Sequence, residues 1–272
     1  MNKIYQVYQV SDSTGETLDR IFLALKAQFS NFECKTIHYS FTRTKNQVDK
    51  IITKSKLEKN VIILYTVVDK ELSKYLVSEA KKNNVANFEV LGNLISDFSK
   101  LLGQQATRIP SGQHALDKEY YKRIEAVQFT MTHDDGKIVN DLEKSDVVLV
   151  GISRTSKTPT SIYLANRGYK VANIPIIQNK SLPDSLIKNY KKIFVVGLIC
   201  DANRLLDVRR NRINSLHEER HSDYTDEKEI LAEVESSKNL FKKYNWPVID
   251  VTRKSVEETA ASIIKILDIL HS

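Results

Sequence analysis

The sequence predicts an α/β protein made of two parallel-sheet domains, and three observations support that prediction. Short apolar runs typical of buried strands alternate with segments of helical periodicity along the whole chain. Twice, a strand run leads into a turn of small hydroxylated residues and then a helix, at residues 4–25 and 147–165. The length of 272 residues exceeds the usual single core of roughly 100–200 residues, so two domains are expected.

The first half of the chain contains four strand–helix pairs, of which the last is short. Strands are expected at residues 4–10, 34–41, 61–68 and 88–91, and helices at 18–25, 46–57, 70–82 and 94–102. Strands that alternate with helices in this way form βαβ units and a parallel sheet. Periodicity is lost after Gln104, and Pro110-Ser111-Gly112 interrupts the chain. The first domain is therefore predicted to span residues 1–106.

The second domain, residues 107–272, opens with a helix-like stretch at 114–133 that ends at the turn signal Asp134-Asp135-Gly136. Strands are expected at 147–150, 171–174, 193–199 and 246–251, and helices from residue 162 and at 204–216, 227–244 and 256–270. Ser255 followed by Glu258 is a capping box that marks the start of the closing helix. The alternation again predicts a parallel sheet.

The composition indicates a globular protein of the cytoplasm. The longest apolar run, residues 61–68, is far shorter than the ~18 residues of a membrane span, and the N-terminus lacks a signal-peptide pattern. Two cysteines, Cys34 and Cys200, fit a reducing compartment. The net charge of +7 raises the alternative of nucleic-acid binding, but the lysines alternate with acidic residues. We therefore expect a mixed solvated surface, with neither nucleic acid nor membrane as a partner.

Residues 151–158, GISRTSKT, have the frame of the phosphate-binding loop G-x-x-x-x-G-K-[ST], with Ser156 at the second glycine. In such loops backbone N–H groups and a lysine bind phosphate oxygens, and the final hydroxyl can ligate Mg²⁺. The alternative is a Ser/Thr-rich helix cap without a ligand. The preceding strand, the following helix and the extra cation Arg154 favour a nucleotide site. Its predicted binding residues are Gly151, Ile152, Ser153, Arg154, Thr155, Ser156, Lys157 and Thr158, with Lys157 catalytic and Thr158 the metal ligand.

A second turn of this type follows the first strand, at residues 11–17 with the sequence SDSTGET. Ser13 and Glu16 could form a capping box, which is the structural interpretation. Clustered hydroxyls and Gly15 at a helix N-terminus would equally suit a phosphoryl group. Under that interpretation Asp12, at the end of the strand, is a catalytic base or a metal ligand.

Two further features of the second domain are candidates for catalysis. Arg209 and Arg212 share a helix face at spacing i, i+3, and guanidinium groups bind phosphoryl oxygens bidentately. A basic solvated helix face is the alternative. Asp250 ends an apolar strand, where the ligand crevices of open α/β sheets lie. The same residues also fit an ordinary strand, loop and capped helix.

Taken together, these motifs resemble one family, the regulatory proteins of pyruvate, phosphate dikinase and of phosphoenolpyruvate synthase. The similarity spans almost the whole chain and is carried by VSDSTGET, GQHALDKEYYKRIEAVQF with HDDG, VGISRTSKTPTSIYLANRGYKVANIP, LPDSLIKN, RLLDVRRNR and VIDVTRKSVEETA. The serine within GISRTSKTP is part of the family pattern.

The resemblance implies a bifunctional enzyme. Members phosphorylate a threonine of the dikinase with ADP as donor, which inactivates it, and remove the phosphate by phosphorolysis with inorganic phosphate, releasing pyrophosphate. It implies that residues 151–158 bind ADP in a P-loop kinase-like domain, that Mg²⁺ is required, and that pyruvate, phosphate dikinase is the protein partner. The alternatives are the synthase as target, a small-metabolite kinase, or a non-catalytic nucleotide-binding or nucleic-acid-binding protein. A homodimer is left open.

Overall fold

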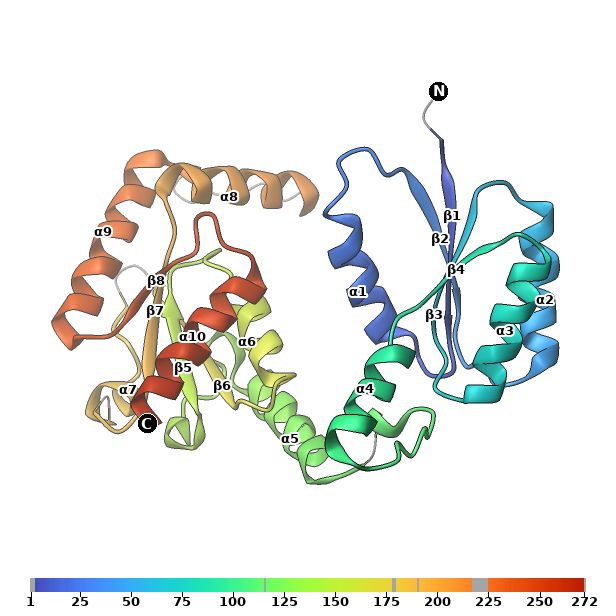
Figure 1. Ribbon diagram of the computed structural model, residues 1–272. Coiled ribbons are helices and arrows are strands. Elements are labelled where there is room, and N and C mark those ends of the chain that lie inside the picture. The colour runs from blue at the N-terminus through green and yellow to red at the C-terminus, as the bar shows by residue number, and fades with distance from the viewer. Residues whose placement is uncertain (1–2, 115, 178–179, 190, 217–224, 272) are drawn as a thin grey trace. The chain divides into compact units, whose positions relative to one another are not determined.

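A computed structural model describes residues 3–114, 116–177, 180–189, 191–216 and 225–271. The chain divides into two compact units, Met1–Ala115 and Leu116–Ser272, and each is an α/β unit with its own sheet (Figure 1). Both sheets have four strands, all parallel. The predicted α/β class with two parallel sheets is thereby confirmed.

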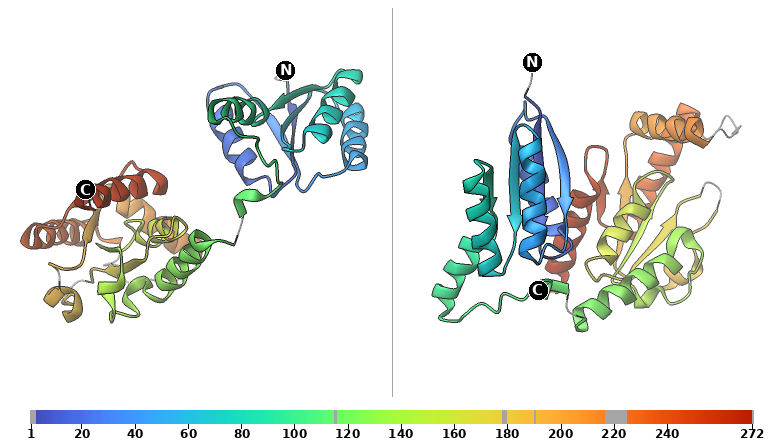
Figure 2. Two further views of the ribbon diagram at one scale, coloured as in Figure 1. Left: turned by 60° about the horizontal axis from the view of Figure 1, so that its bottom comes forward. Right: turned by 90° about the vertical axis from the view of Figure 1, so that its right-hand side faces the viewer.

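The first unit follows the predicted alternation. Its elements are β1 (Tyr5–Ser11), α1 (Glu16–Lys26), β2 (Cys34–Tyr39), α2 (Lys45–Leu57), β3 (Val61–Thr66), α3 (Lys70–Lys82), β4 (Ala86–Glu89), α4 (Gly92–Leu102) and the 3-10 turn η1 (Gly112–His114). The strand order is β2-β1-β3-β4. Helix α1 lies on one face of this sheet, and α2 and α3 lie on the other (Figures 1 and 2).

Strand β1 is buried on both faces because helices cover each side of the sheet. Val7 packs with Leu18 and Phe22 of α1. The adjacent Tyr8 points the other way, since side chains alternate along a strand, and packs in the cluster that includes Ile51 of α2. These contacts fix the end of β1, and with it the turn that follows, at the carboxyl edge of the sheet.

The second unit repeats the pattern after a long helix. Its elements are α5 (Lys118–Thr132), the 3-10 turns η2 (Asp134–Gly136) and η3 (Leu142–Lys144), β5 (Val147–Gly151), α6 (Lys157–Ala165), β6 (Val171–Pro175), α7 (Asp184–Asn189), β7 (Val195–Ile199), α8 (Ala202–Leu216), α9 (Glu227–Tyr244), β8 (Val248–Asp250) and α10 (Val256–His271). The strand order is β6-β5-β7-β8. All five residues of β5 are buried, so this strand is the centre of the core.

Both units therefore have the same strand order, in which the first strand lies between the second and the third. In β2-β1-β3-β4 and in β6-β5-β7-β8 the direction of winding reverses beside that first strand. Open α/β sheets bind ligands outside the carboxyl ends of their strands at this switch point. The turns after β1 and β5, at residues 11–17 and 151–158, lie there.

Three local features differ from the expectation. The first unit extends to Ala115 rather than to residue 106, because the predicted linker packs onto it: Ser111 Oγ donates to Ser13 Oγ at 2.9 Å. The capping box of Ser13 and Glu16 is absent, since Gly15 is the N-cap of α1 and no side chain caps it. Helix α7 was not predicted. The capping box of Ser255 and Glu258 is confirmed, with both reciprocal hydrogen bonds present.

None of the described helices is both long enough and apolar enough to cross a membrane.

Candidate functional site

The turn after β5 is held close to the neighbouring strand at Gly151. A Cβ atom at this position would lie 2.7 Å from the carbonyl oxygen of Leu198 and 2.7 Å from Thr155 Oγ1, so only glycine fits. The chain then turns through two left-handed residues, Arg154 (φ 71°) and Ser156 (φ 58°). Left-handed backbone is what glycine adopts most readily. Ser156 thus takes the backbone conformation that a glycine would favour.

The start of α6 has no side-chain cap. Ser156 is its N-cap, and the side chain of Ser156 makes no capping hydrogen bond. The first N–H groups of a helix have no partner within the helix and carry a partial positive charge. The turn therefore presents uncapped donors at the carboxyl edge of the sheet, which is the geometry that binds phosphate at helix N-termini.

Lys157 lies inside this turn. Its side chain is 6% exposed, and Nζ donates to the carbonyl oxygen of Ile152 at 2.9 Å. Burial lowers the pKa of Lys157 to about 8, while the nearby carboxylates of Asp135 and Asp134 oppose that shift. A cation at the centre of the turn is thus held by the loop's own backbone.

Thr158 is hydrogen-bonded to residues that the sequence interpretation did not connect with it. Its hydroxyl donates to Asp134 Oδ1 at 3.1 Å and accepts from Asn173 Nδ2 at 3.0 Å. Asn173 Nδ2 also donates to Asp134 Oδ1 at 2.5 Å. The turn signal Asp134-Asp135-Gly136 was interpreted only as the end of a helix, and no pattern in the sequence linked it to residue 158.

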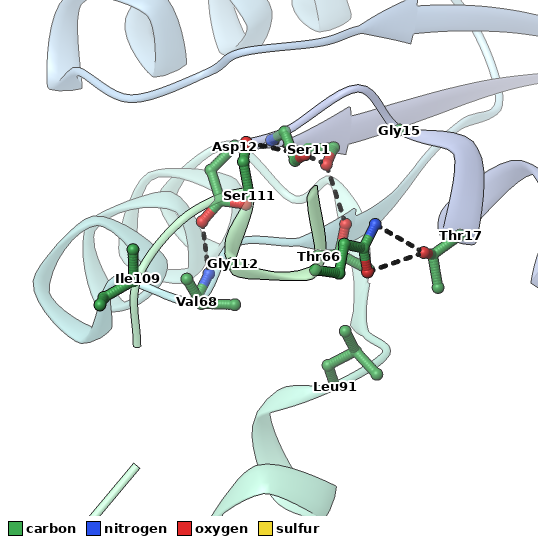
Figure 3. Close-up of a pocket in the computed structure, with 12 residues that line it drawn as sticks. Ser11, Asp12, Gly15, Thr17, Thr66, Val68, Leu91, Ile109, Ser111 and Gly112 are labelled. Atoms are coloured by element: carbon green, nitrogen blue, oxygen red, sulfur yellow. Dashed lines mark hydrogen bonds between the residues drawn. The ribbon is translucent and has the colours of Figure 1, made fainter. Parts of the chain in front are cut away.

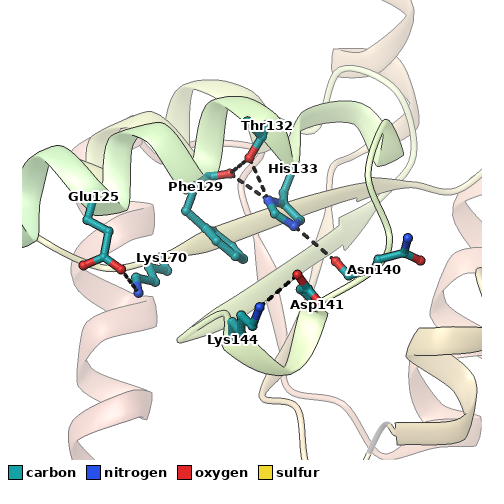
Figure 4. Close-up of polar contacts among 8 residues, drawn as sticks. All are labelled: Glu125, Phe129, Thr132, His133, Asn140, Asp141, Lys144 and Lys170. Atoms are coloured by element: carbon teal, nitrogen blue, oxygen red, sulfur yellow. Dashed lines mark hydrogen bonds and ion pairs between the residues drawn. The ribbon is translucent and has the colours of Figure 1, made fainter.

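The turn that carries Asp134 is fixed by His133 at the end of α5 (Figure 4). The imidazole stacks on Phe129, with 3.9 Å between ring centroids. Its Nδ1 lies 2.8 Å from the carbonyl oxygen of Phe129, and its Nε2 lies 3.2 Å from that of Asn140. The backbone N–H of Asn173 donates to the carbonyl oxygen of His133 at 2.9 Å. Helix end, loop and strand β6 are thereby joined.

The two arginines of α8 have different surroundings. Arg209 is 1% exposed and donates to Glu233 Oε2 at 2.6 Å and to Glu233 Oε1 at 3.4 Å. Its Nη2 also lies 3.5 Å from the carbonyl oxygen of Ser153, in the turn after β5. Arg212, one turn further along α8, is exposed. Arg209 therefore links Glu233 to the backbone of the turn after β5.

Asp250 ends the edge strand β8, two strands away from β5. Its Oδ1 accepts from the backbone N–H of Thr252 at 2.9 Å and from the Thr252 hydroxyl at 2.5 Å. These bonds lower its pKa, with the hydroxyl bond the largest cause. A carboxylate stabilised in its charged form in this way is a weak proton acceptor.

A large cavity of about 780 Å³ lies in the second unit beside the turn at Ile152. Its walls combine apolar side chains, among them Ile176, Leu182 and Leu240, with polar ones such as Ser236 and Asn239. Ligand pockets of roughly 300–1,000 Å³ with this mixture are typical of small-molecule sites.

In the first unit, the turn after β1 borders a cavity of about 180 Å³ (Figure 3). Hydroxyl-bearing residues, the N-terminus of α1 and residues of the predicted linker line it; the lining includes Ser11, Asp12, Ser13, Gly15, Thr17, Thr66, Ser111, Gly112 and Gln113. Arg43 Nη2 donates to Ser111 Oγ at 3.1 Å. Sequence reasoning missed Arg43 and the linker residues, because they lie far along the chain from the turn.

Asp12 is 3% exposed in this cavity wall. Its Oδ2 accepts from the backbone N–H of Val68 at 2.7 Å, and Arg43 Nε donates to its carbonyl oxygen at 2.8 Å. Burial raises the pKa of Asp12, and the Val68 hydrogen bond and the charge of Arg43 oppose the shift. A carboxylate with a raised pKa accepts protons more readily than an ordinary aspartate.

The structure describes a two-unit α/β protein with a turn around the buried Lys157 in its second unit, and comparisons with known proteins identify its family. The sequence profile described as kinase/pyrophosphorylase matches residues 7–264. The chain belongs to this kinase/pyrophosphorylase family.

Relatives in three bacteria carry the name pyruvate, phosphate dikinase regulatory protein. The protein of Pelagibacter ubique is 58% identical over 269 residues, which cover 99% of this chain and 98% of the relative. That of Sphingopyxis alaskensis is 43% identical over 262 residues, with 96% of both chains covered. That of Rhizobium meliloti is 44% identical over 261 residues, covering 96% of this chain and 95% of the relative.

Proposed function

We propose that this protein is a cytoplasmic, bifunctional regulator of pyruvate, phosphate dikinase. It phosphorylates a threonine of that enzyme with ADP as donor, and it removes the same phosphate by transfer to inorganic phosphate. Family membership and the names of the relatives support the class of activity and the target. The observation that carries the proposal is the turn at residues 151–158, where an uncapped helix N-terminus and the buried Lys157 converge.

In the kinase direction, the β-phosphoryl group of ADP lies in this turn. The threonine oxygen of the target attacks the β-phosphorus, the bond to the bridging oxygen breaks, and AMP leaves with the electron pair. Lys157 and the uncapped N–H groups stabilise the charge that spreads over the phosphoryl oxygens. Mg²⁺ bound at Thr158 would neutralise part of the same charge.

In the reverse direction, an oxygen of inorganic phosphate attacks the phosphorus of phosphothreonine. The bond to the threonine oxygen breaks, pyrophosphate is released, and the threonine hydroxyl is restored by a proton. Both reactions transfer a phosphoryl group between oxygen nucleophiles, so one set of cations and N–H donors serves both.

The cavity beside Ile152 supports a nucleotide as the ligand of the second unit. Its volume of about 780 Å³ lies within the range of roughly 300–1,000 Å³ that small-molecule ligands occupy. Under the proposal the nucleoside part of ADP lies in this cavity, with the phosphates in the adjoining turn. Arg209 positions the turn through Ser153, and the exposed Arg212 binds the phosphoryl group under the proposal.

The cavity of the first unit supports a second anion site for the protein substrate. The uncapped start of α1, the hydroxyls of Ser11, Ser13 and Thr17, and the nearby Arg43 suit a phosphate. Asp12 accepts the proton of the target threonine as general base under the proposal. Asp250, the next candidate for the base, is a weaker proton acceptor, because its hydrogen bonds to Thr252 lower its pKa.

The experiment that tests the function supplies ADP and each purified target in turn, the dikinase and phosphoenolpyruvate synthase, and locates phosphothreonine by mass spectrometry. The proposal expects modification of the dikinase and, with inorganic phosphate, release of pyrophosphate from the modified enzyme. Modification of the synthase alone would assign the other target. Rapid phosphorylation of a small metabolite from ATP, with neither protein modified, would replace the proposal with a metabolite kinase.

A further inference from the structure

The turn η2 places a carboxylate against the end of the nucleotide-binding turn. Asp134 Oδ1 accepts hydrogen bonds from Thr158 Oγ1 and Asn173 Nδ2. Within the described part of the chain, its other oxygen, Oδ2, receives no hydrogen bond. In this half-buried carboxylate, Oδ1 is therefore occupied by the protein, and Oδ2 is left for a ligand.

The hydroxyl of Thr158 is oriented by the same contacts. A threonine hydroxyl has one proton to donate and two lone pairs that can accept. The proton of Thr158 goes to Asp134, and one lone pair accepts from Asn173 Nδ2. The remaining lone pair is free to coordinate a cation. The hydroxyl thus has its rotation fixed before any ligand arrives.

Asn173 is the part of this arrangement that packing alone does not explain. Its side chain is 0% exposed, and its Oδ1 is buried without a hydrogen-bond partner among the described residues. Burying an amide oxygen without a partner is costly. The position lies within β6, where an apolar residue would remove that cost. The contribution of Asn173 is that its Nδ2 joins Asp134 to Thr158.

The chemistry of these oxygen atoms fits a divalent cation that arrives with a nucleotide. Mg²⁺ prefers oxygen ligands and is usually bound by one or two carboxylates together with phosphate oxygens. Among the described residues no group of three or more His, Cys, Asp and Glu side chains is placed to hold a metal. The pair at residues 134 and 158 is therefore too small to be a cation site by itself and requires the phosphate oxygens.

We propose that Asp134 and Thr158 together ligate a divalent cation that binds with a nucleoside diphosphate, and that Asn173 is the positioning residue for both. The inference rests on the proposed nucleotide site and adds a carboxylate ligand to it. His133 holds the turn in place, since its ring and backbone join the end of α5, the loop at Asn140 and β6.

Calorimetric titration with ADP, in Mg²⁺ and in EDTA, tests this pairing. We expect Mg²⁺ to strengthen ADP binding by the wild-type protein, and Asp134→Asn to weaken binding at least tenfold in Mg²⁺ while leaving binding in EDTA unchanged. Electron paramagnetic resonance titration with Mn²⁺ in the presence of ADP should show the same loss of bound cation. Asp141→Asn is the matched control, because Asp141 is exposed and pairs only with Lys144 among the described residues.

A second pair of variants covers the case in which Asp134→Asn fails to fold. Thr158→Ser keeps the hydroxyl and should bind Mn²⁺ with ADP as the wild type does. Thr158→Val has nearly the same shape without the hydroxyl and should lose the Mn²⁺ signal, while thermal unfolding followed by circular dichroism shows a folded protein.

The outcomes separate this inference from the proposed function. If the wild type binds ADP with cation dependence and both Asp134→Asn and Thr158→Val retain it, the inference is overturned and the nucleotide site stands. Equal affinity for ADP in Mg²⁺ and in EDTA would also overturn the inference, and the nucleotide site would still stand. If the wild type binds no ADP under either condition, the proposed function falls, and the cation site falls with it.

Discussion

The turns after β1 and β5 have the same backbone plan but different chemistry. Each follows the first strand of a sheet with the same strand order, and each ends in a left-handed N-cap without a side-chain cap, Gly15 (φ 93°) and Ser156 (φ 58°). The turn of the second unit surrounds a buried lysine, whereas that of the first unit surrounds a buried aspartate. The two turns thus have a similar backbone at the helix N-terminus. They differ in the charge of the buried side chain.

Burial favours the neutral form of both side chains, and it therefore shifts their pKa values in opposite directions. It lowers the pKa of Lys157 to about 8 and raises the pKa of Asp12. With a pKa of about 8, the lysine is still mostly charged near neutral pH, and the raised pKa makes the aspartate a better proton acceptor than an ordinary one. Under the proposed function, Lys157 stabilises phosphoryl charge and Asp12 transfers a proton.

Removing the cation should have the largest effect. Lys157→Ala is expected to lower both the kinase and the phosphorolysis rates by about a thousandfold, the order found when a cationic phosphoryl clamp is lost. The fold should remain intact, because burial of the ammonium costs desolvation energy and the substitution removes that cost. Both rates and the circular dichroism spectrum are measured. Lys144→Ala, at an exposed surface pair, should change neither rate. An unchanged rate in one direction would exclude a site shared by both reactions.

Removing the carboxylate should have the next largest effect. Asp12→Asn is expected to lower turnover about a hundredfold, as for loss of a general base, while ADP affinity stays nearly unchanged. Steady-state kinetics and ADP titration check the two parts. Asp97→Asn, at an exposed pair with Lys100, is the matched control. Normal turnover in a folded Asp12→Asn protein would reduce this turn to a structural role.

The pH dependence sharpens the contrast between the turns. With the pKa of Lys157 at about 8, the value of kcat/KM for ADP should fall about tenfold per pH unit above pH 8, because the free enzyme then loses the cation. Between pH 8 and the ordinary lysine pKa of 10.5, the unfolded chain binds more protons than the folded one. The free energy of unfolding, relative to that of Lys157→Met, should therefore rise with pH in this window. A flat profile in both measurements would contradict the buried ammonium.

The smallest effects concern the two N-caps and should have opposite signs. Gly15→Ala places a side chain on left-handed backbone and should destabilise the protein by ~1 kcal/mol. Ser156→Gly relieves that strain and, after the entropy cost of glycine, should stabilise it by ~0.5 kcal/mol. Gly112→Ala is the control, because a Cβ there meets nothing within 4 Å. Urea unfolding followed by circular dichroism measures all three, and equal signs at residues 15 and 156 would contradict the shared plan.

Local patterns in the sequence were sufficient to predict the strands, the parallel sheets and both turns, because periodicity and small-residue turns are properties of neighbouring residues. The contacts that complete each site connect distant segments. Asp134 meets Thr158 only because β6 lies beside β5 and carries Asn173 between them. Ser111 reaches Ser13 although the linker pattern predicted no packing. Arg209, a predicted phosphate ligand, forms an ion pair with Glu233, and no spacing on α8 could indicate that contact.

Helix α5 begins near the start of the second unit and ends beside the contacts that surround Thr158. It begins at Lys118, directly after the boundary at Ala115 and Leu116, and ends beside His133. At 1.5 Å per residue its 15 residues form a rod of ~22 Å. Because the imidazole of His133 stacks on Phe129 and lies within hydrogen-bond distance of carbonyl oxygens before and after it, the position of the carboxylate beside Thr158 is tied to the end of this helix.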